Sequence, residues 1–221
     1  MSPDLPTPAR ALAIAAHLAS HLICTDGSKG SWDPAADTAA LVVTRQAEQR
    51  AAAAALGATG TCVFLGWPDG ELEAGLRQRW EVAYWIRRLR PDVVLGHDPW
   101  KRYRLHPDHR NAGLLAVEGI VAARDPHFFP EMQSAPHRPT TLLLWEADEV
   151  DHVEDVSGHG PAKVASLLEH RSQFHTTHGI DDPADEGQVE RFRRRIEDEL
   201  ADMGRSADLA QGEAFKRIDR L

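Results

Sequence analysis

The chain has 221 residues, of which 42% are hydrophobic and 27% charged; these ordinary globular values exclude a disordered, collagenous or coiled-coil chain. With 25 Lys and Arg against 34 Asp and Glu, the formal net charge is −9, which argues against a nucleic-acid or anionic-membrane binder. Two cysteines, Cys24 and Cys62, cannot form a disulfide framework and favour a cytoplasmic location. No apolar run approaches the roughly 18 residues of a membrane span. The length predicts one domain over residues 1–221, with a helical C-terminal portion from about residue 160.

Short apolar runs alternate with longer helical patterns along the chain. Strands are predicted for residues 11–16, 21–25, 61–65, 92–95, 141–145 and 152–156. Helices are predicted for residues 37–56, 71–89, 107–123, 161–174 and 189–200. This alternation predicts an α/β fold, a Rossmann-like three-layer sandwich with a mostly parallel sheet. The first, alanine-rich run also suits a helix over residues 8–21, because the three residues after His17 are too few for a parallel crossover.

Histidine or aspartate follows four of the predicted strands. These residues are His17, Asp26, Asp69 and the pair His97-Asp98. Because ligands of an open parallel sheet bind beyond the carboxyl ends of its strands, these positions predict one crevice with a functional site. The alternative is that the aspartates only cap turns.

The densest local signal is His106-Pro107-Asp108-His109, at the start of a predicted helix. Proline is favoured at the first helical position, so His106 is the predicted N-cap and His109 lies one turn later on the same side. Two imidazoles at this spacing suit a Zn²⁺ ion or a catalytic pair, and Asp108 can orient one of them. The alternative is a pair of surface histidines at a helix cap. Tyr103, in the basic segment before this motif, is a further candidate for substrate contact.

The chain resembles the PIG-L / LmbE-like de-N-acetylases, zinc enzymes that remove acetyl from N-acetylglucosamine-type substrates. The motifs that carry the resemblance are Thr25-Asp26-Gly27, Arg45 with Glu48, Gly66-Trp67-Pro68-Asp69-Gly70, Arg90-Pro91-Asp92-Val93-Val94, His97-Asp98-Pro99 and His106-Pro107-Asp108-His109-Arg110. The resemblance implies that His109 is a zinc ligand, with His17 as a second. It also implies that His106 stabilises the oxyanion and is oriented by Asp108. By the same resemblance, Arg45 and Asp69 lie on the substrate side.

The N-terminal motif of the family is incomplete here. Family members carry Ala-His-Pro-Asp-Asp, in which one aspartate is the general base and the other completes the zinc site with the histidine. In this chain Ala16-His17 is followed by Leu18-Ala19-Ser20. A catalytic zinc site usually has three protein ligands plus water, and a lost general base costs about 10²–10⁴ in rate. Asp26 and Asp98, on neighbouring predicted strand ends, are the candidates to stand in for the base.

The first functional hypothesis is a zinc-dependent hydrolase that removes acetyl from an N-acetylglucosamine-type glycoside or glycolipid. Its expected partner is a small-molecule amino-sugar conjugate, and a second copy of the chain in a homo-oligomer is also considered. The alternative is a catalytically dead relative or truncated product that at most binds a glycoside. A nucleotide-binding α/β protein is disfavoured, because no predicted strand is followed by a Gly-x-Gly-x-x-Gly turn.

Overall fold

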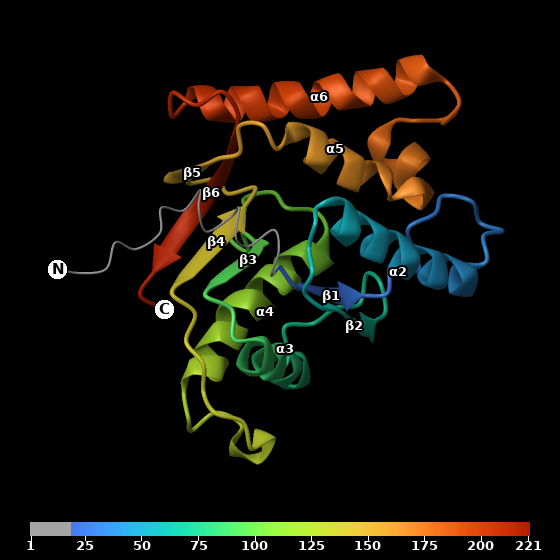
Figure 1. The fold of residues 1–221 in the computed structure, drawn as a ribbon. Helices are drawn as coiled ribbons and strands as arrows, with labels where there is room; N and C mark the ends of the chain where they lie inside the picture. The colour runs from blue at the N-terminus through green and yellow to red at the C-terminus, as the bar shows by residue number, and fades with distance from the viewer. Residues whose placement is uncertain (1–18) are drawn as a thin grey trace. The chain divides into compact units, whose positions relative to one another are not determined.

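The computed structural model describes residues 19–221 (Figure 1), and these divide into two compact units. Unit 1 consists of the described residues up to Asp69 together with Val153–Glu213. Unit 2 consists of Gly70–His152 and Ala214–Leu221. The strand predicted over 11–16 and the predicted ligand His17 lie outside the described residues.

Unit 1 contains two parallel strands, β1 (His21–Thr25) and β2 (Cys62–Trp67), connected through helix α2 (Thr38–Ala55). The strands pair from His21 opposite Cys62, and the register shifts once, between Ile23 and Thr25. The strand–helix–strand unit predicted for this part of the chain is therefore confirmed.

A capping side chain explains where α2 begins, and a glycine explains where it ends. The Asp37 carboxylate accepts the backbone N–H groups of Ala39 and Ala40, both at 3.0 Å, and so satisfies two donors of the first turn. Gly57, with φ of 73°, follows the helix and provides the left-handed residue with which many helices end.

The remainder of unit 1 is largely helical. Its elements are α5 (Gly160–Leu168), the 3₁₀ turn η2 (Arg171–Gln173), the π-helical turn η3 (Phe174–His178) and α6 (Glu186–Arg205). Its buried apolar core consists of Val164, Ile180, Phe192, Ile196 and Leu200. The apolar stripe predicted for residues 189–200 is thus the inner face of α6, which the structure extends at both ends.

The single helix predicted over 161–174 is wrong beyond Leu168. The Glu48 carboxylate of α2 accepts the backbone N–H of Ser172 at 2.7 Å and its hydroxyl at 2.6 Å. A backbone donor at this position therefore bonds to a distant side chain, and the chain continues as the short turns η2 and η3.

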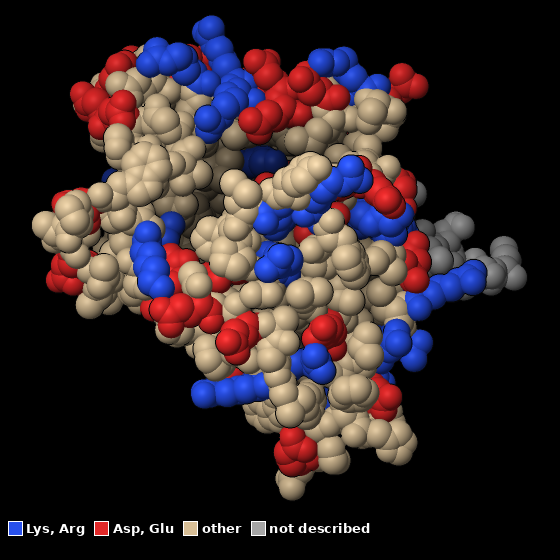
Figure 2. Space-filling model, turned by 180° about the vertical axis from the view of Figure 1, so that it is seen from behind, with Lys and Arg blue, Asp and Glu red and all other residues tan. Residues whose placement is uncertain are grey.

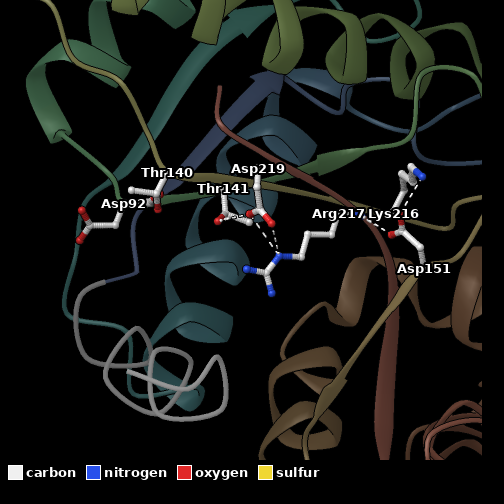
Figure 3. Close-up of polar contacts among 7 residues, drawn as sticks. All are labelled: Asp92, Thr140, Thr141, Asp151, Lys216, Arg217 and Asp219. Carbon is white, nitrogen blue, oxygen red and sulfur yellow. Dashed lines mark hydrogen bonds and ion pairs between the residues drawn. The ribbon is translucent and has the colours of Figure 1, made fainter. Parts of the chain in front are cut away.

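Unit 2 contains strand β3 (Val93–His97) parallel to β4 (Thr141–Trp145), with the end of β6 (Gly212–Asp219) antiparallel to β4. Strand β6 was not predicted, because polar residues interrupt it and it does not form an apolar run. Thr141 Oγ1 and Arg217 Nε both donate to the Asp219 carboxylate, at 2.8 and 2.9 Å (Figure 3). These contacts fix the last residues of the chain against β4.

One further strand and one 3₁₀ turn complete the described chain. Strand β5 (His152–Asp155), predicted over 152–156, crosses from unit 2 into unit 1. Just after it, the Val156 backbone N–H donates to the Gln211 carbonyl at 3.2 Å within unit 1. A 3₁₀ turn, η1 (Pro130–Met132), lies in unit 2 between α4 and β4.

Two helices of unit 2, α3 (Leu76–Leu89) and α4 (Pro107–Arg124), pack against each other. The helix predicted over 71–89 begins five residues late. Asp108 of α4 accepts the backbone N–H groups of Gly70 and Leu72 at 2.6 and 3.2 Å. These donors are therefore bound to the side chain of another helix, and the segment before α3 is irregular.

The surface carries charges of both signs. Basic and acidic side chains are interspersed over the face drawn in Figure 2, in keeping with a net charge of only −9. Among residues 19–221 no helix is long and apolar enough to cross a membrane.

Candidate active site

The start of helix α4 presents two imidazoles side by side. His106 is the N-cap, as predicted, and its Nδ1 accepts the backbone N–H of Asp108 at 3.3 Å. The rings of His106 and His109 stack with centroids 4.7 Å apart. Because Nδ1 of His106 is an acceptor, a neutral ring carries its proton on Nε2, which is then a donor.

Asp108 is buried, with 4% of its surface exposed. Both of its oxygens accept backbone N–H groups, those of Gly70 and Leu72. The carboxylate thus anchors the segment before α3 to the first turn of α4. Its predicted role in orienting His106 remains a prediction.

A third histidine joins the pair from the neighbouring strand. His97 ends β3, and its ring stacks on His109 at a centroid distance of 4.4 Å with an interplanar angle of 10°. The indole N–H of Trp145, the last residue of β4, donates to His97 Nδ1 at 2.8 Å. Burial, followed by the nearby His109 and Arg104, lowers the pKa of His97 to about 4. Partial burial, followed by His106 and Arg104, also lowers the pKa of His109. Both rings are therefore neutral at pH 7 and have nitrogen lone pairs.

Arg104 and Glu146 complete the cluster. Arg104 Nη1 donates to Glu146 Oε2 at 2.7 Å and to His97 Nδ1 at 3.0 Å. Burial raises the pKa of Glu146, but the hydrogen bond and charge of Arg104 outweigh it, so the net shift is downward and the carboxylate is ionised. Glu146 was not selected from the sequence, and Arg104 was considered only as part of the basic segment around Tyr103. Glu146 directly follows β4, so the strand-end argument that selected His97 would also have found it.

The donor set fits a divalent cation. Among residues 19–221 and within unit 2, ligand atoms of His97, His109 and Glu146 all lie within 4.8 Å of one another. Two imidazoles and a glutamate are the protein ligands of one well-known type of catalytic zinc site. The other ligand implied by the resemblance, His17, lies outside the described residues.

Two other candidates lie in the segment between β3 and α4. Asp98 is buried, and its Oδ1 accepts the backbone N–H of Trp100 at 2.9 Å, so this carboxylate caps its own turn. Tyr103 is 85% exposed and has a positive φ of 60°. Their predicted roles as stand-in base and substrate contact remain predictions.

The remaining candidates lie together in unit 1. Arg45, Asp26 and His170 are among the residues lining a cavity of about 190 Å³. Arg45 Nη1 donates to the Gly27 carbonyl at 2.8 Å. Burial raises the pKa of Asp26, but backbone and side-chain hydrogen bonds from Ser28, together with the backbone N–H of Asp69, outweigh it and lower it overall. Asp26 is thus an ionised turn cap in a polar cavity.

The match to a family model covers about half of the chain. The model, described as PIG-L GlcNAc-PI de-N-acetylase, matches residues 10–120. The diacetylchitobiose deacetylase of Thermococcus kodakarensis is 32% identical over 157 residues, which cover 70% of this chain and 58% of that protein. The chain thus matches less than two thirds of the length of this relative.

Solved structures show the same fold. The N,N'-diacetylchitobiose deacetylase of Pyrococcus horikoshii, in complex with an inhibitor, superposes with a TM-score of 0.80 at 24% identity over 96% of this chain and 76% of that one. GalB of Pseudomonas putida KT2440, a 4-carboxy-2-hydroxymuconate hydratase, gives 0.70 at 19% identity over 97% and 89%. The predicted α/β fold class is confirmed. Because a deacetylase and a hydratase share it, the reaction must be argued from the site.

Proposed function

The chain belongs to the PIG-L family of de-N-acetylases, and from this premise we propose that it is a metal-dependent hydrolase of N-acetylglucosamine-type substrates. The bond cleaved is the acetamide, and the products are acetate and a free amino sugar. The observation that carries the proposal is the stacked pair His106 and His109 at the first turn of α4, with a third imidazole beside it. The 32% identity to a diacetylchitobiose deacetylase supports the same substrate class.

The histidines have separable tasks in this proposal. His109 and its neighbours in the cluster hold the cation, which when bound supplies Lewis-acid activation of water and of the acetyl carbonyl. His106 donates from Nε2 to the oxyanion, since its Nδ1 is engaged by the backbone N–H of Asp108. The positive end of α4 favours negative charge at the same place. Tyr103, in the same unit as the histidines, is proposed as a contact to the sugar, and the substrate-side roles of Arg45 and Asp69 stay predictions of the resemblance.

A second candidate function is a glycoside-binding protein without turnover. It is favoured by one specific observation, namely that Leu18-Ala19-Ser20 stands where the family motif has Pro-Asp-Asp. The candidate bases Asp26 and Asp98 are both engaged in capping their own turns. Metal content and acetate release separate the two functions.

The test is acetate release from N,N'-diacetylchitobiose by the purified chain supplied with Zn²⁺. His109→Ala should lower the rate by at least about 10²-fold, as loss of a key catalytic group typically does, and a chelator should do the same. His127→Ala, which changes an exposed histidine of the same unit, is the control and should leave the rate unchanged. Binding of the sugar with no acetate release by the zinc-loaded wild type would instead support the second function.

A further inference from the structure

We infer that His97, His109 and Glu146 form a divalent-cation site that the guanidinium of Arg104 occupies in the metal-free protein, so that Zn²⁺ and Arg104 compete for it. This ligand set replaces the carboxylates missing from the N-terminal motif. It deepens the proposed function and rests on it only for the identity of the reaction, because cation binding is measured without turnover.

Strand β3, helix α4 and the residue just after strand β4 present the ligands. His97 is the last residue of β3 and pairs with Trp145 of β4, so Glu146, the next residue, follows the same strand end. His109 comes from α4, which approaches β3 so closely that a Cβ at Gly113 would lie 2.4 Å from the His97 carbonyl oxygen, an approach that glycine permits. Positions set by strand pairing and close helix packing hold ligands more precisely than loop positions do.

One guanidinium nitrogen sits where a cation would bind. Arg104 Nη1 lies 3.0 Å from His97 Nδ1 and 2.7 Å from Glu146 Oε2, and so uses both of its hydrogens on two atoms that can ligate a metal. The indole N–H of Trp145 also points at His97 Nδ1. Because Nδ1 of a neutral imidazole has a single lone pair, Zn²⁺ bound at this atom displaces both Arg104 and the indole N–H, whereas the Glu146 carboxylate already faces the Arg104 charge.

The rest of the guanidinium is poorly satisfied. The Arg104 side chain is only 6% exposed, and within the described part of the chain its Nε and Nη2 are buried without a hydrogen-bond partner. A buried arginine normally uses its planar fork of donors on several acceptors, and leaving them unmet is costly. Arg104 is thus held by one nitrogen alone, as expected of an occupant that a divalent cation can displace.

The experiment is a Zn²⁺ titration of the full, chelator-stripped chain at pH 7, followed by calorimetry. Arg104→Gln should bind Zn²⁺ at least about tenfold more tightly than wild type, because a unit charge a few ångströms from the cation is removed. Arg102→Gln, which changes an exposed arginine of the same loop, should match wild type. Arg104→Met, which fills the same space without a donor, is the second variant if the first does not fold.

The ligands are tested in the Arg104→Gln background. Adding His97→Phe or Glu146→Gln should weaken Zn²⁺ binding at least about tenfold, since each removes one of three ligands. Equal affinity of Arg104→Gln and wild type would overturn the competition. Unchanged affinity after adding either ligand substitution would overturn the ligand set and place the cation elsewhere. A protein that binds Zn²⁺ as expected but releases no acetate would sink only the proposed reaction.

Discussion

At the scale of single residues, His178 is a buried histidine whose hydrogen-bonding capacity is not fully satisfied. It is 6% exposed, its ring lies between those of Phe174 and Phe192, and among residues 19–221 its Nδ1 has no hydrogen-bond partner. Burial, followed by the charges of His170 and Arg195, lowers the pKa of His178 to about 4. The folded protein keeps this ring neutral, while the unfolded chain protonates it below about pH 6.5. Its contribution to stability is therefore intact above pH 6.5 and is lost as the pH falls toward 4.

Replacing His178 by Phe should make unfolding less sensitive to acid. Between pH 7 and 5 the wild type should lose about 2 kcal/mol more unfolding free energy than His178→Phe, at about 1.4 kcal/mol per pH unit below 6.5. Urea denaturation at the two pH values measures this difference. His159→Gln, which changes an exposed histidine of the same unit, should keep the wild-type pH dependence. Identical pH dependence of His178→Phe and wild type would contradict the assignment.

At the scale of elements, one arginine of α3 terminates helix α4. The Arg87 side chain is buried, and its Nη2 donates to the carbonyls of Ala122, Asp125 and Phe128 at 3.0, 2.8 and 2.9 Å. Its Nε donates to the Ala123 carbonyl at 3.1 Å. The last carbonyls of a helix have no partner within it, so a single guanidinium supplies what a C-terminal cap otherwise would.

Arg87→Met should therefore lower the free energy of unfolding far more than the same substitution at the neighbouring Arg88. Methionine fills a similar volume but leaves several buried carbonyls unpaired, which predicts a loss of about 3 kcal/mol or more in unfolding free energy. Arg88→Met, at the exposed adjacent position, should change it by less than about 0.5 kcal/mol. Urea unfolding of both variants checks the contrast, and equal losses would show that the four hydrogen bonds contribute little.

At the scale of the whole molecule, local signals in the sequence predicted local structure. The Pro107 and His106 pattern predicted the start of α4, and the helix predicted over 37–56 is observed as α2 between Asp37 and Gly57, because such caps act within one turn. The predictions failed where a distant side chain decided the backbone, as at Gly70–Leu72, which Asp108 holds, and at Ser172, which Glu48 holds. No pattern within those segments contains that information.

In the candidate site, too, local signals were predicted and a contact between distant positions was missed. His106 and His109 were predicted from their spacing and His97 from its place after a predicted strand, whereas the pairing of Arg104 with Glu146 joins positions 42 residues apart. Strand pairing places His97 beside Trp145, so the segments that carry Arg104 and Glu146 both leave the same end of the parallel pair β3 and β4. Only the topology of unit 2 therefore reveals that a cationic side chain stands among the ligands.

Each unit contains buried apolar side chains, and this predicts where a core cavity acts. Phe192→Ala opens the core of unit 1, and Leu144→Ala removes a fully buried side chain of unit 2. The losses in unfolding free energy should be about 3–5 and 2–5 kcal/mol. Because local stability follows local packing, native-state hydrogen exchange should speed up first in α5 and α6 for Phe192→Ala, and first in β3 and β4 for Leu144→Ala. If each substitution accelerated exchange equally in both units, the chain would unfold as one cooperative body, and packing within a unit would not set the stability of that unit separately.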